Sequence, residues 1–191
     1  MNNNKLILES TQYNEYCTEM TYNWIDFINY TNTLHKEDQL DAVNKHVNQL
    51  IHYSTDESTW GENDKWTTPL ELFSKGQGDC EDIAILKMIT LLELDWDPEL
   101  LRLHYVNAKM GSETVAHMIL AVHDQEELNN PLVLDCMISS IRQLHARRDL
   151  ESVYAFNMHK LWVNNELTEH NPRQRMSKWN TLLNDIEREM Y

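Results

Sequence analysis

The sequence predicts an α+β fold, because helical patterns fill the first half of the chain and strand patterns follow them. In the first half, apolar residues recur at three- and four-residue steps, which is typical of helices that cover a core with one face. Beyond about residue 100, apolar and polar residues alternate in short runs, as they do in strands. Helices followed by adjacent strands favour α+β over an alternating α/β arrangement.

The length and composition of the chain predict one globular domain over residues 1–191. The chain has 191 residues, of which 41% are apolar, and this is enough to bury a sizeable core. Its formal net charge of -15 argues against binding to nucleic acid or to anionic membranes, because both reward Lys and Arg. The acidic composition is instead consistent with binding of cations, with binding of basic partners, or simply with solubility.

The cysteines and the apolar runs of the sequence indicate the compartment in which the protein is expected. The three cysteines, Cys17, Cys80 and Cys136, are widely spaced and odd in number, so we expect free thiols and no disulfide framework. The N-terminal apolar run is too short for a signal peptide, and no later run approaches the ~20 apolar residues that a membrane span needs. As written, the chain is expected to be cytoplasmic and not inserted in a membrane.

The helices are predicted from their spacing and from one start signal. The residues Leu40 to Ile51 form an amphipathic helix, and the polar segment 54–64 after it is expected to be a loop. The sequence Thr68-Pro69-Leu70-Glu71 matches a capping box, so a short helix should start there. From Cys80 to Leu94 the chain is apolar almost all round, which is typical of a helix buried at the centre of a domain.

The second half of the chain is predicted to contain strands and one closing helix. The expected strands are Leu101–Tyr105, Val115–Val122, Leu132–Met137 and Val153–Met158, and the expected helix is Trp179–Met190 after a turn at Asn171-Pro172. The second and third of these strands are expected to pair as neighbours across a long connection.

The segment from Gly76 to Asp82 carries the strongest chemical signal. Cys80 lies after two glycines and at the start of the central helix, where free amide N–H groups lower a thiol pKa and can hold an oxyanion. Three carboxylates, those of Asp79, Glu81 and Asp82, crowd the same sulfur and should raise its pKa. Taken alone, these carboxylates are more often explained by simple capping, with Asp79 as the N-cap and Glu81 and Asp82 at the positive helix end.

Two polar residues interrupt the apolar strands. His117 lies inside the run 115–122, and Asp135 directly follows Leu132-Val133-Leu134. Thiol catalysis needs a base for the sulfur and a third group that orients the imidazole, and Cys80, His117 and Asp135 supply these parts. A lone strand histidine is more often a satisfied core residue, and a lone aspartate after a strand is often a turn residue. Only the complete set makes them catalytic candidates.

A series of short motifs between Trp60 and Trp162 resembles the bacterial transglutaminase-like cysteine proteinases. The motifs are Trp60-Gly61, Trp66-Thr67-Thr68-Pro69, Gly78-Asp79-Cys80-Glu81-Asp82, Leu101-Arg102-Leu103-His104-Tyr105-Val106, Ala116-His117-Met118-Ile119-Leu120, Pro131-Leu132-Val133-Leu134-Asp135, Asp149-Leu150 and Phe156-Asn157. The resemblance implies a papain-like, transglutaminase-like fold with N-terminal helices and a central helix that carries the cysteine and packs on an antiparallel sheet.

The resemblance also implies roles for the residues. Cys80 would be the nucleophile, His117 the base and Asp135 its orienting partner. The family is calcium-dependent through acidic residues around its cysteine, which match Asp79, Glu81 and Asp82. Calcium would reconcile the thiol with its carboxylates, because a divalent cation reverses the field that they create.

The expected function is hydrolysis of a peptide bond in a protein substrate through a thioester. The same residues would make a protein-glutamine acyltransferase if an amine replaced water. A catalytically inactive calcium-binding domain and an acidic interaction domain stay open as alternatives. A regulatory protein partner is not identified by these residues. Members of the family are exported, so the resemblance implies a periplasmic location if the N-terminus is truncated.

Overall fold

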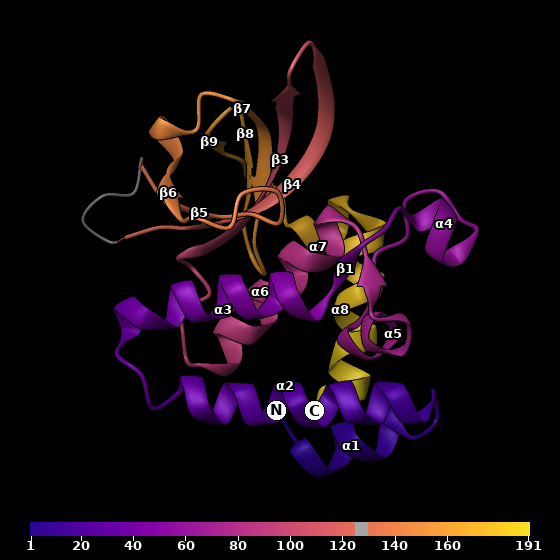
Figure 1. Cartoon of the computed structure of the whole chain (residues 1–191). Helices are drawn as coiled ribbons and strands as arrows, with labels where there is room; N and C mark the ends of the chain where they lie inside the picture. Colours follow the sequence, from indigo (N-terminus) through magenta and orange to yellow (C-terminus); the bar gives the residue numbers. More distant parts are fainter. Residues whose placement is uncertain (125–129) are drawn as a thin grey trace.

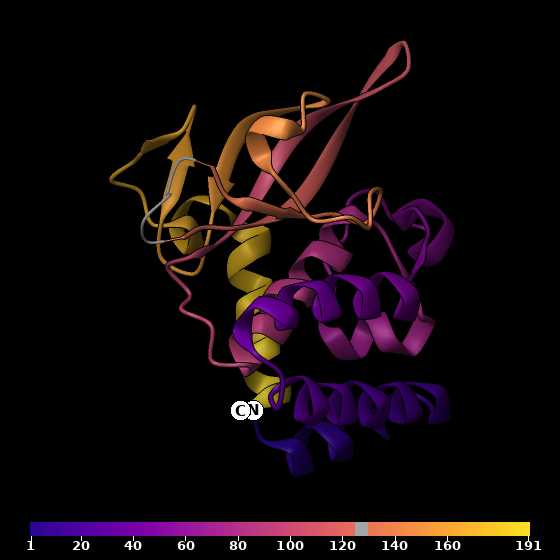
Figure 2. The ribbon, with the colours of Figure 1, turned by 60° about the vertical axis from the view of Figure 1, so that its left-hand side comes forward.

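The computed structural model describes residues 1–124 and 130–191 and places a layer of helices beneath a twisted sheet (Figures 1 and 2). The helices of the first half are α1 (Asn3–Ser10), α2 (Glu15–Thr31), α3 (Lys36–Leu50), α4 (Asp56–Trp60), α5 (Pro69–Lys75) and α6 (Cys80–Glu93). Short strands β1 (His52–Tyr53) and β2 (Gln77–Gly78) pair in parallel between them. The strands of the second half are β3 (Leu101–Met110), β4 (Glu113–Val122), β5 (Leu132–Leu134), β6 (Arg142–Gln143), β7 (Leu150–Phe156), β8 (Leu161–Val163) and β9 (Glu166–Leu167). The remaining elements are the 3-10 turn η1 (Leu144–Ala146) and the helices α7 (Pro172–Arg175) and α8 (Ser177–Met190).

The main sheet is antiparallel throughout, as expected. Within the described residues its strand order is β6-β5-β4-β3-β7-β8-β9. The strands β3 and β4 pair along their whole length, but β4 pairs with β5 only as far as Leu120↔Leu134. The two strands separate beyond that pair, on the side where His117 and Asp135 lie. The end of this pairing therefore opens the sheet at the candidate site.

Helix α6 occupies the centre of the molecule. It lies between α3 on one side and the strands β3 and β4 on the other, so no face of it is left to solvent (Figure 1). Its apolar side chains from Ile83 to Leu91 are buried, with Ile85 and Leu86 each 1% exposed. This confirms the prediction of a central buried helix that begins at Cys80. The packing on both sides explains why its sequence shows no polar face.

Several predicted boundaries need correction. The third strand ends at Leu134 and not at Met137, because the chain turns away from β4 there. The segment 54–64 contains the short helix α4, which Thr55 caps, and is not entirely a loop. Asn171-Pro172 is the start of helix α7 and not a simple turn. The capping box at Thr68 is confirmed, with its hydroxyl accepting from the Glu71 amide at 3.2 Å.

The ends of the chain meet on the helical layer. The Asn2 amide donates to the Met190 carbonyl at 2.8 Å, and the N-terminal amine pairs with Glu93 at 3.0 Å. Among the described residues, no helix combines the length and apolarity that crossing a lipid bilayer would need.

The core contains a buried lysine on α6. Lys87 of α6 is fully buried, and its Nζ forms no hydrogen bond with any described residue. Burial lowers the pKa of Lys87 to about 8, and the nearby Cys136 and Asp135 oppose this effect only partly. The lysine ammonium is therefore destabilised in the folded state relative to the unfolded chain.

Replacing Lys87 by Met should stabilise the protein. A folded-state pKa of about 8 against an ordinary value of 10.5 corresponds to about 3 kcal/mol. Below about pH 8, the buried charge lowers the free energy of unfolding by this full amount. Between about pH 8 and 10.5 the unfolded chain keeps a proton on Lys87 that the folded protein has lost, so the free energy of unfolding rises with pH and the penalty disappears. Urea unfolding should show a gain for Lys87→Met at pH 7 that shrinks by pH 10. A loss at pH 7 would mean that Lys87 has a stabilising partner in solution.

Candidate active site

Two glycines allow the turn that positions Cys80 at the start of α6. Gly76 ends α5 with a positive φ of 63°, which side chains rarely adopt. Gly78 lies so close to its neighbours that an added Cβ would be 2.5 Å from Leu72 Cδ1 and 2.7 Å from Asp82 Oδ2. Any other residue at position 78 would force the side chain of Leu72 or Asp82 to move. The glycines therefore permit the sharp return that places Cys80 at the helix N-terminus.

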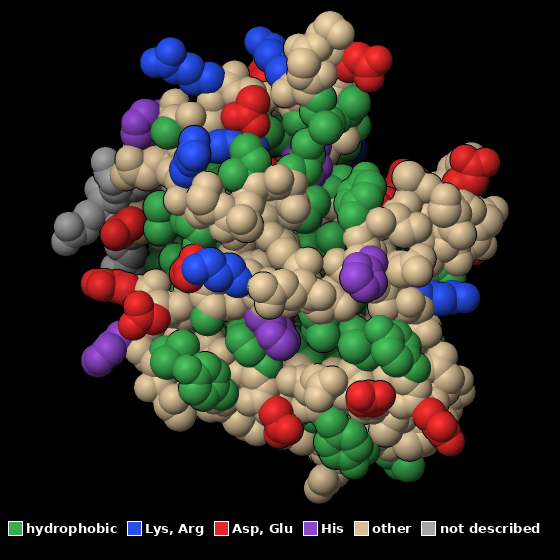
Figure 3. Space-filling view, viewed as in Figure 1, with side chains coloured by type: hydrophobic (Ala, Val, Ile, Leu, Met, Phe, Trp, Pro, Cys, Tyr) green, Lys and Arg blue, Asp and Glu red, His purple; other side chains and the backbone are tan. Residues whose placement is uncertain are grey.

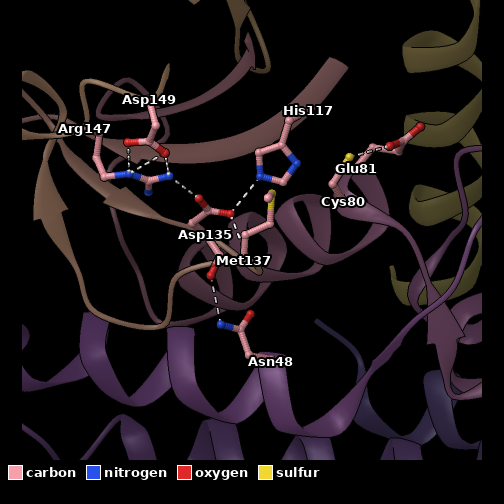
Figure 4. Close-up of polar contacts among 8 residues, drawn as sticks. All are labelled: Asn48, Cys80, Glu81, His117, Asp135, Met137, Arg147 and Asp149. Carbon is pink, nitrogen blue, oxygen red and sulfur yellow. Dashed lines mark hydrogen bonds and ion pairs between the residues drawn. The ribbon is translucent and has the colours of Figure 1, made fainter. Parts of the chain in front are cut away.

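A chain of hydrogen bonds runs away from His117 (Figure 4). His117 Nε2 lies 2.8 Å from Asp135 Oδ1, and the Met137 amide donates to the same oxygen at 3.0 Å. Arg147 Nη2 donates to Asp135 Oδ2 at 2.8 Å and to Asp149 Oδ2 at 2.7 Å. Burial acts to raise the pKa of Asp135, but the contacts with His117, Met137 and Arg147 lower it to about 2. Asp135 is therefore an ionised, oriented carboxylate.

The thiol of Cys80 faces this chain from α6. Figure 4 shows its sulfur pointing toward the edge of the His117 ring that does not bond Asp135. Both side chains line a cavity of about 310 Å³. Aromatic rings of Trp66, Tyr105 and Tyr154 form part of its wall, and the two tyrosine rings stack at 5.0 Å. The cysteine, the imidazole and an aromatic cleft thus meet at one place.

The thiol is not activated in this arrangement. Cys80 Sγ donates to Glu81 Oε2 at 3.1 Å. Burial raises the pKa of Cys80 strongly, and the charge and hydrogen bond of Glu81 raise it further, while the Met118 amide acts in the opposite direction. The predicted conflict between the thiol and its carboxylates is therefore present in the structure.

An acidic cluster adjoins the thiol. Carboxylate oxygens of Asp56, Asp79 and Asp82 lie within 4.8 Å of one another. Asp56 Oδ1 and Asp79 Oδ1 are buried without a hydrogen-bond partner among the described residues. Burial, followed by the hydrogen bond and charge of Glu81, raises the pKa of Asp79 to about 9. Orphaned, crowded carboxylate oxygens are what a hard cation such as Ca²⁺ requires, so the residues fit that metal.

The predicted metal ligands have different positions in this cluster. Asp79 belongs to it directly. Asp82 also joins α6 to the preceding loop, since its Oδ1 accepts from the Thr67 amide at 2.9 Å and hydroxyl at 2.7 Å. Glu81 groups instead with Asp79 and Cys80. Asp56 enters the cluster from α4, far from the others in sequence.

The family assignment follows from comparison with known proteins. The profile of the family described as bacterial transglutaminase-like cysteine proteinase matches residues 5–166, most of the chain. The chain belongs to this family. It is therefore a cysteine peptidase, with the transglutaminase-like fold that the motifs implied.

Solved structures of a relative agree over nearly the whole chain. LapG from Legionella pneumophila is 30% identical, with a TM-score of 0.82 over 97% of this chain and 98% of that one. An EGTA-treated form of LapG gives a TM-score of 0.83, and a calcium-bound form gives 0.82 at 31% identity. No curated protein sequence matches the chain.

Sequence reasoning missed two residues of the site. Asp56 lies in a segment that was expected to be a loop, and only the Thr55-Asp56-Glu57 cap pattern hinted at a helix there. Arg147 stands in a polar stretch next to Arg148, and nothing in the sequence separates the two. Arg147 is 3% exposed, whereas Arg148 lies on the surface. Three-dimensional packing alone distinguishes them.

This difference predicts contrasting effects for two arginine substitutions. Arg147→Met should lower the free energy of unfolding by about 3 kcal/mol, because it leaves the buried Asp135 carboxylate with one fewer partner. Arg148→Met removes the same charge from the surface and should change stability by less than about 0.5 kcal/mol. Chemical denaturation at pH 7 compares them. Equal losses would show that Asp135 does not depend on Arg147.

Proposed function

We propose that the protein is a calcium-dependent cysteine endopeptidase in which Cys80, His117 and Asp135 act together on a peptide bond. The family supplies the class of enzyme. The observation that carries the residue assignment is the orientation of His117, which bonds Asp135 through Nε2 and turns its other edge to the Cys80 sulfur. This is the order of contacts that a thiol, a base and an orienting group require.

The first half of the proposed reaction forms a thioester. With its Nε2–H donated to Asp135, His117 has Nδ1 free to take the Cys80 proton. The thiolate attacks the peptide carbonyl carbon, forming a C–S bond as the carbonyl electron pair moves to oxygen. The Cys80 amide, at the N-terminus of α6, would donate to that oxyanion. Collapse breaks the C–N bond, and His117 returns the proton to the departing amine.

The second half regenerates the thiol. A water molecule gives one proton to His117 and attacks the thioester carbon. Collapse breaks the C–S bond and releases a carboxylic acid, and the proton on His117 returns to Cys80. The net reaction consumes one water and yields one acid and one amine. Asp135 keeps the imidazole in the required tautomer throughout.

The acidic cluster is proposed to hold Ca²⁺ through Asp56, Asp79 and Asp82, with Glu81 at its border. Its two orphaned buried oxygens support this assignment, and a calcium-bound structure exists for the similar LapG. When bound, calcium would supply positive charge beside Cys80 and would tie α4 to the start of α6. It would thus oppose the carboxylate field that keeps the thiol protonated.

The face of the molecule shown in Figure 3 presents no acidic track of the kind that an acidic interaction domain would need. Figure 3 shows acidic side chains scattered over this face instead of gathered in one patch. A mimic of nucleic acid would need a continuous acidic track for a basic partner. The acidic side chains on this face are better explained as solvated surface groups, and a protein substrate that enters the aromatic cleft is the proposed partner.

Selective alkylation tests the assignment of the nucleophile and its base. Cys80 should react with iodoacetamide at least about tenfold faster in calcium than in EGTA, because only the thiolate reacts. His117→Ala should abolish this advantage, while His145→Ala, at an exposed position, should keep it. Peptide mapping by mass spectrometry locates the label. Equal rates in calcium and EGTA would contradict the calcium-linked thiol.

Product analysis separates hydrolysis from acyl transfer. Casein treated with the enzyme in calcium should give new peptide termini, and Cys80→Ser should lower their rate by at least about a thousandfold. Methylamine in the same reaction should not appear in the products. Methylamidated glutamine residues without chain cleavage would assign the protein as an acyltransferase instead.

Calcium affinity tests the cluster independently of activity. Asp56→Asn should raise the calcium Kd at least about tenfold, because it removes a charged oxygen ligand. Glu57→Gln removes one charge from the exposed neighbouring position and should leave the Kd nearly unchanged. Isothermal titration calorimetry measures the calcium Kd of both variants. Each variant also carries Cys80→Ala, so that the protein cannot cleave itself during the measurement. Equal affinities would remove Asp56 from the site.

A further inference from the structure

A second cavity lies across β3 from the catalytic cleft. Alternation along the strand turns Leu103 and Tyr105 toward the core and the cleft, and Arg102 and His104 toward the other face of the sheet. There a cavity of about 230 Å³ is lined by polar and apolar groups, among them Arg102, His104, Leu144, Ala155, Trp162 and Asn165. The proposed peptidase reaction uses none of these side chains.

Arg102 brings a positive charge to this cavity, and it forms no ion pair with any of the residues that the structure describes. Its guanidinium lies 3.9 Å from the centre of the Trp162 ring, which holds it in place. Its Nε is buried and donates no hydrogen bond to any described residue. Glu99 acts on it only through space, since the Glu99 carboxylate bonds Lys160 at 2.6 Å. The guanidinium is therefore held in position, and its buried Nε–H meets no acceptor among the described residues.

His104 supplies a second donor in the neutral tautomer that carries its proton on Nε2. The residue is 3% exposed, and its Nδ1 lies 3.0 Å from the Ser152 hydroxyl oxygen. If that hydroxyl donates to Nδ1, the ring proton is on Nε2, which is buried without a hydrogen-bond partner among the described residues. Burial, with the charges of His123 and Arg102, lowers the pKa of His104 to about 3, so its ring is neutral at pH 7. Arg102 then gives the cavity wall a formal positive charge.

Buried donors that lack acceptors carry a desolvation cost, and an anionic ligand would remove it. The volume is below the range of about 300 Å³ and more that suits drug-sized ligands, so the ligand must be small. Leu144 and Ala155 give the cavity an apolar wall, which suits a short hydrocarbon tail better than a phosphate. The guanidinium also disfavours a metal cation at the nearby imidazole.

We propose that this cavity binds a small aliphatic monocarboxylate, with its carboxylate between Arg102 and His104 and its tail against Leu144 and Ala155. The site is separate from the thiol and from the acidic cluster. Its occupancy does not depend on whether the protein cleaves peptides.

Fluorine NMR on the full chain tests this proposal. The probe is 3,3,3-trifluoropropionate, whose resonance should broaden and shift saturably with a Kd of a few millimolar or tighter. Propionate should displace it, while uncharged propionamide of similar size should not. This comparison uses the unaltered protein and so does not depend on the folding of any variant.

Variants then locate the site. Arg102→Gln should weaken probe binding at least about tenfold, and Arg175→Gln, which removes an exposed arginine of α7, should not weaken it. His104→Phe keeps a ring but removes the donor, and should weaken binding several-fold. Circular dichroism confirms folding of each variant.

Three results would overturn the proposal. The first is the absence of saturable binding to the unaltered protein at up to about 50 mM probe, which is weaker than a millimolar site allows. The second is displacement by propionamide as readily as by propionate. The third is stronger displacement by inorganic phosphate than by propionate, which would assign the donors to a different anion class.

Discussion

The buried charge of Asp135 is the constraint on which the arrangement of the candidate site depends. A carboxylate that is 1% exposed needs a hydrogen-bond or ion-pair partner at each oxygen, because an unpaired buried charge strongly destabilises the folded state. His117 and the Met137 amide meet one oxygen, and Arg147 meets the other. From α3, Asn48 holds the Asp135 carbonyl at 2.9 Å. These groups come together because β5 separates from β4 after Leu134 and the chain then leads through η1 to Arg147.

The N-terminus of α6 presents the complementary problem. Its free amides and positive end suit a thiolate, but Asp79 and Glu81 on either side of Cys80 oppose one. The position of the Asp82 carboxylate is fixed, because the amide and the hydroxyl of Thr67 both donate hydrogen bonds to it. The crowding is therefore built into the turn, and Asp56 of α4 adds to it. A cluster of this kind is costly without a cation, which is the physical reason to connect the thiol with calcium.

Much of this arrangement could be predicted from local patterns. The capping box at Thr68, the all-apolar helix from Cys80 and the alternating strands were evident because each depends on neighbours in sequence. His117 and Asp135 stood out because polar residues interrupt apolar runs. Arg147 and Asp56 could not be found, since a solvated arginine or aspartate and a buried one look alike until the chain is folded. The proposed carboxylate cavity was hidden for the same reason.

Two negative centres thus flank one thiol–imidazole pair, and the chain balances them differently. At Asp135 the counter-charge is Arg147, a covalent part of the protein that also bonds Asp149 in a bidentate contact. Because a guanidinium stays protonated, this balance holds at every physiological pH. At Asp56, Asp79 and Asp82 no described cation forms an ion pair with the cluster, so its balance has to come from outside. On the proposed function, the orientation of His117 is therefore permanent, whereas the reactivity of Cys80 depends on calcium.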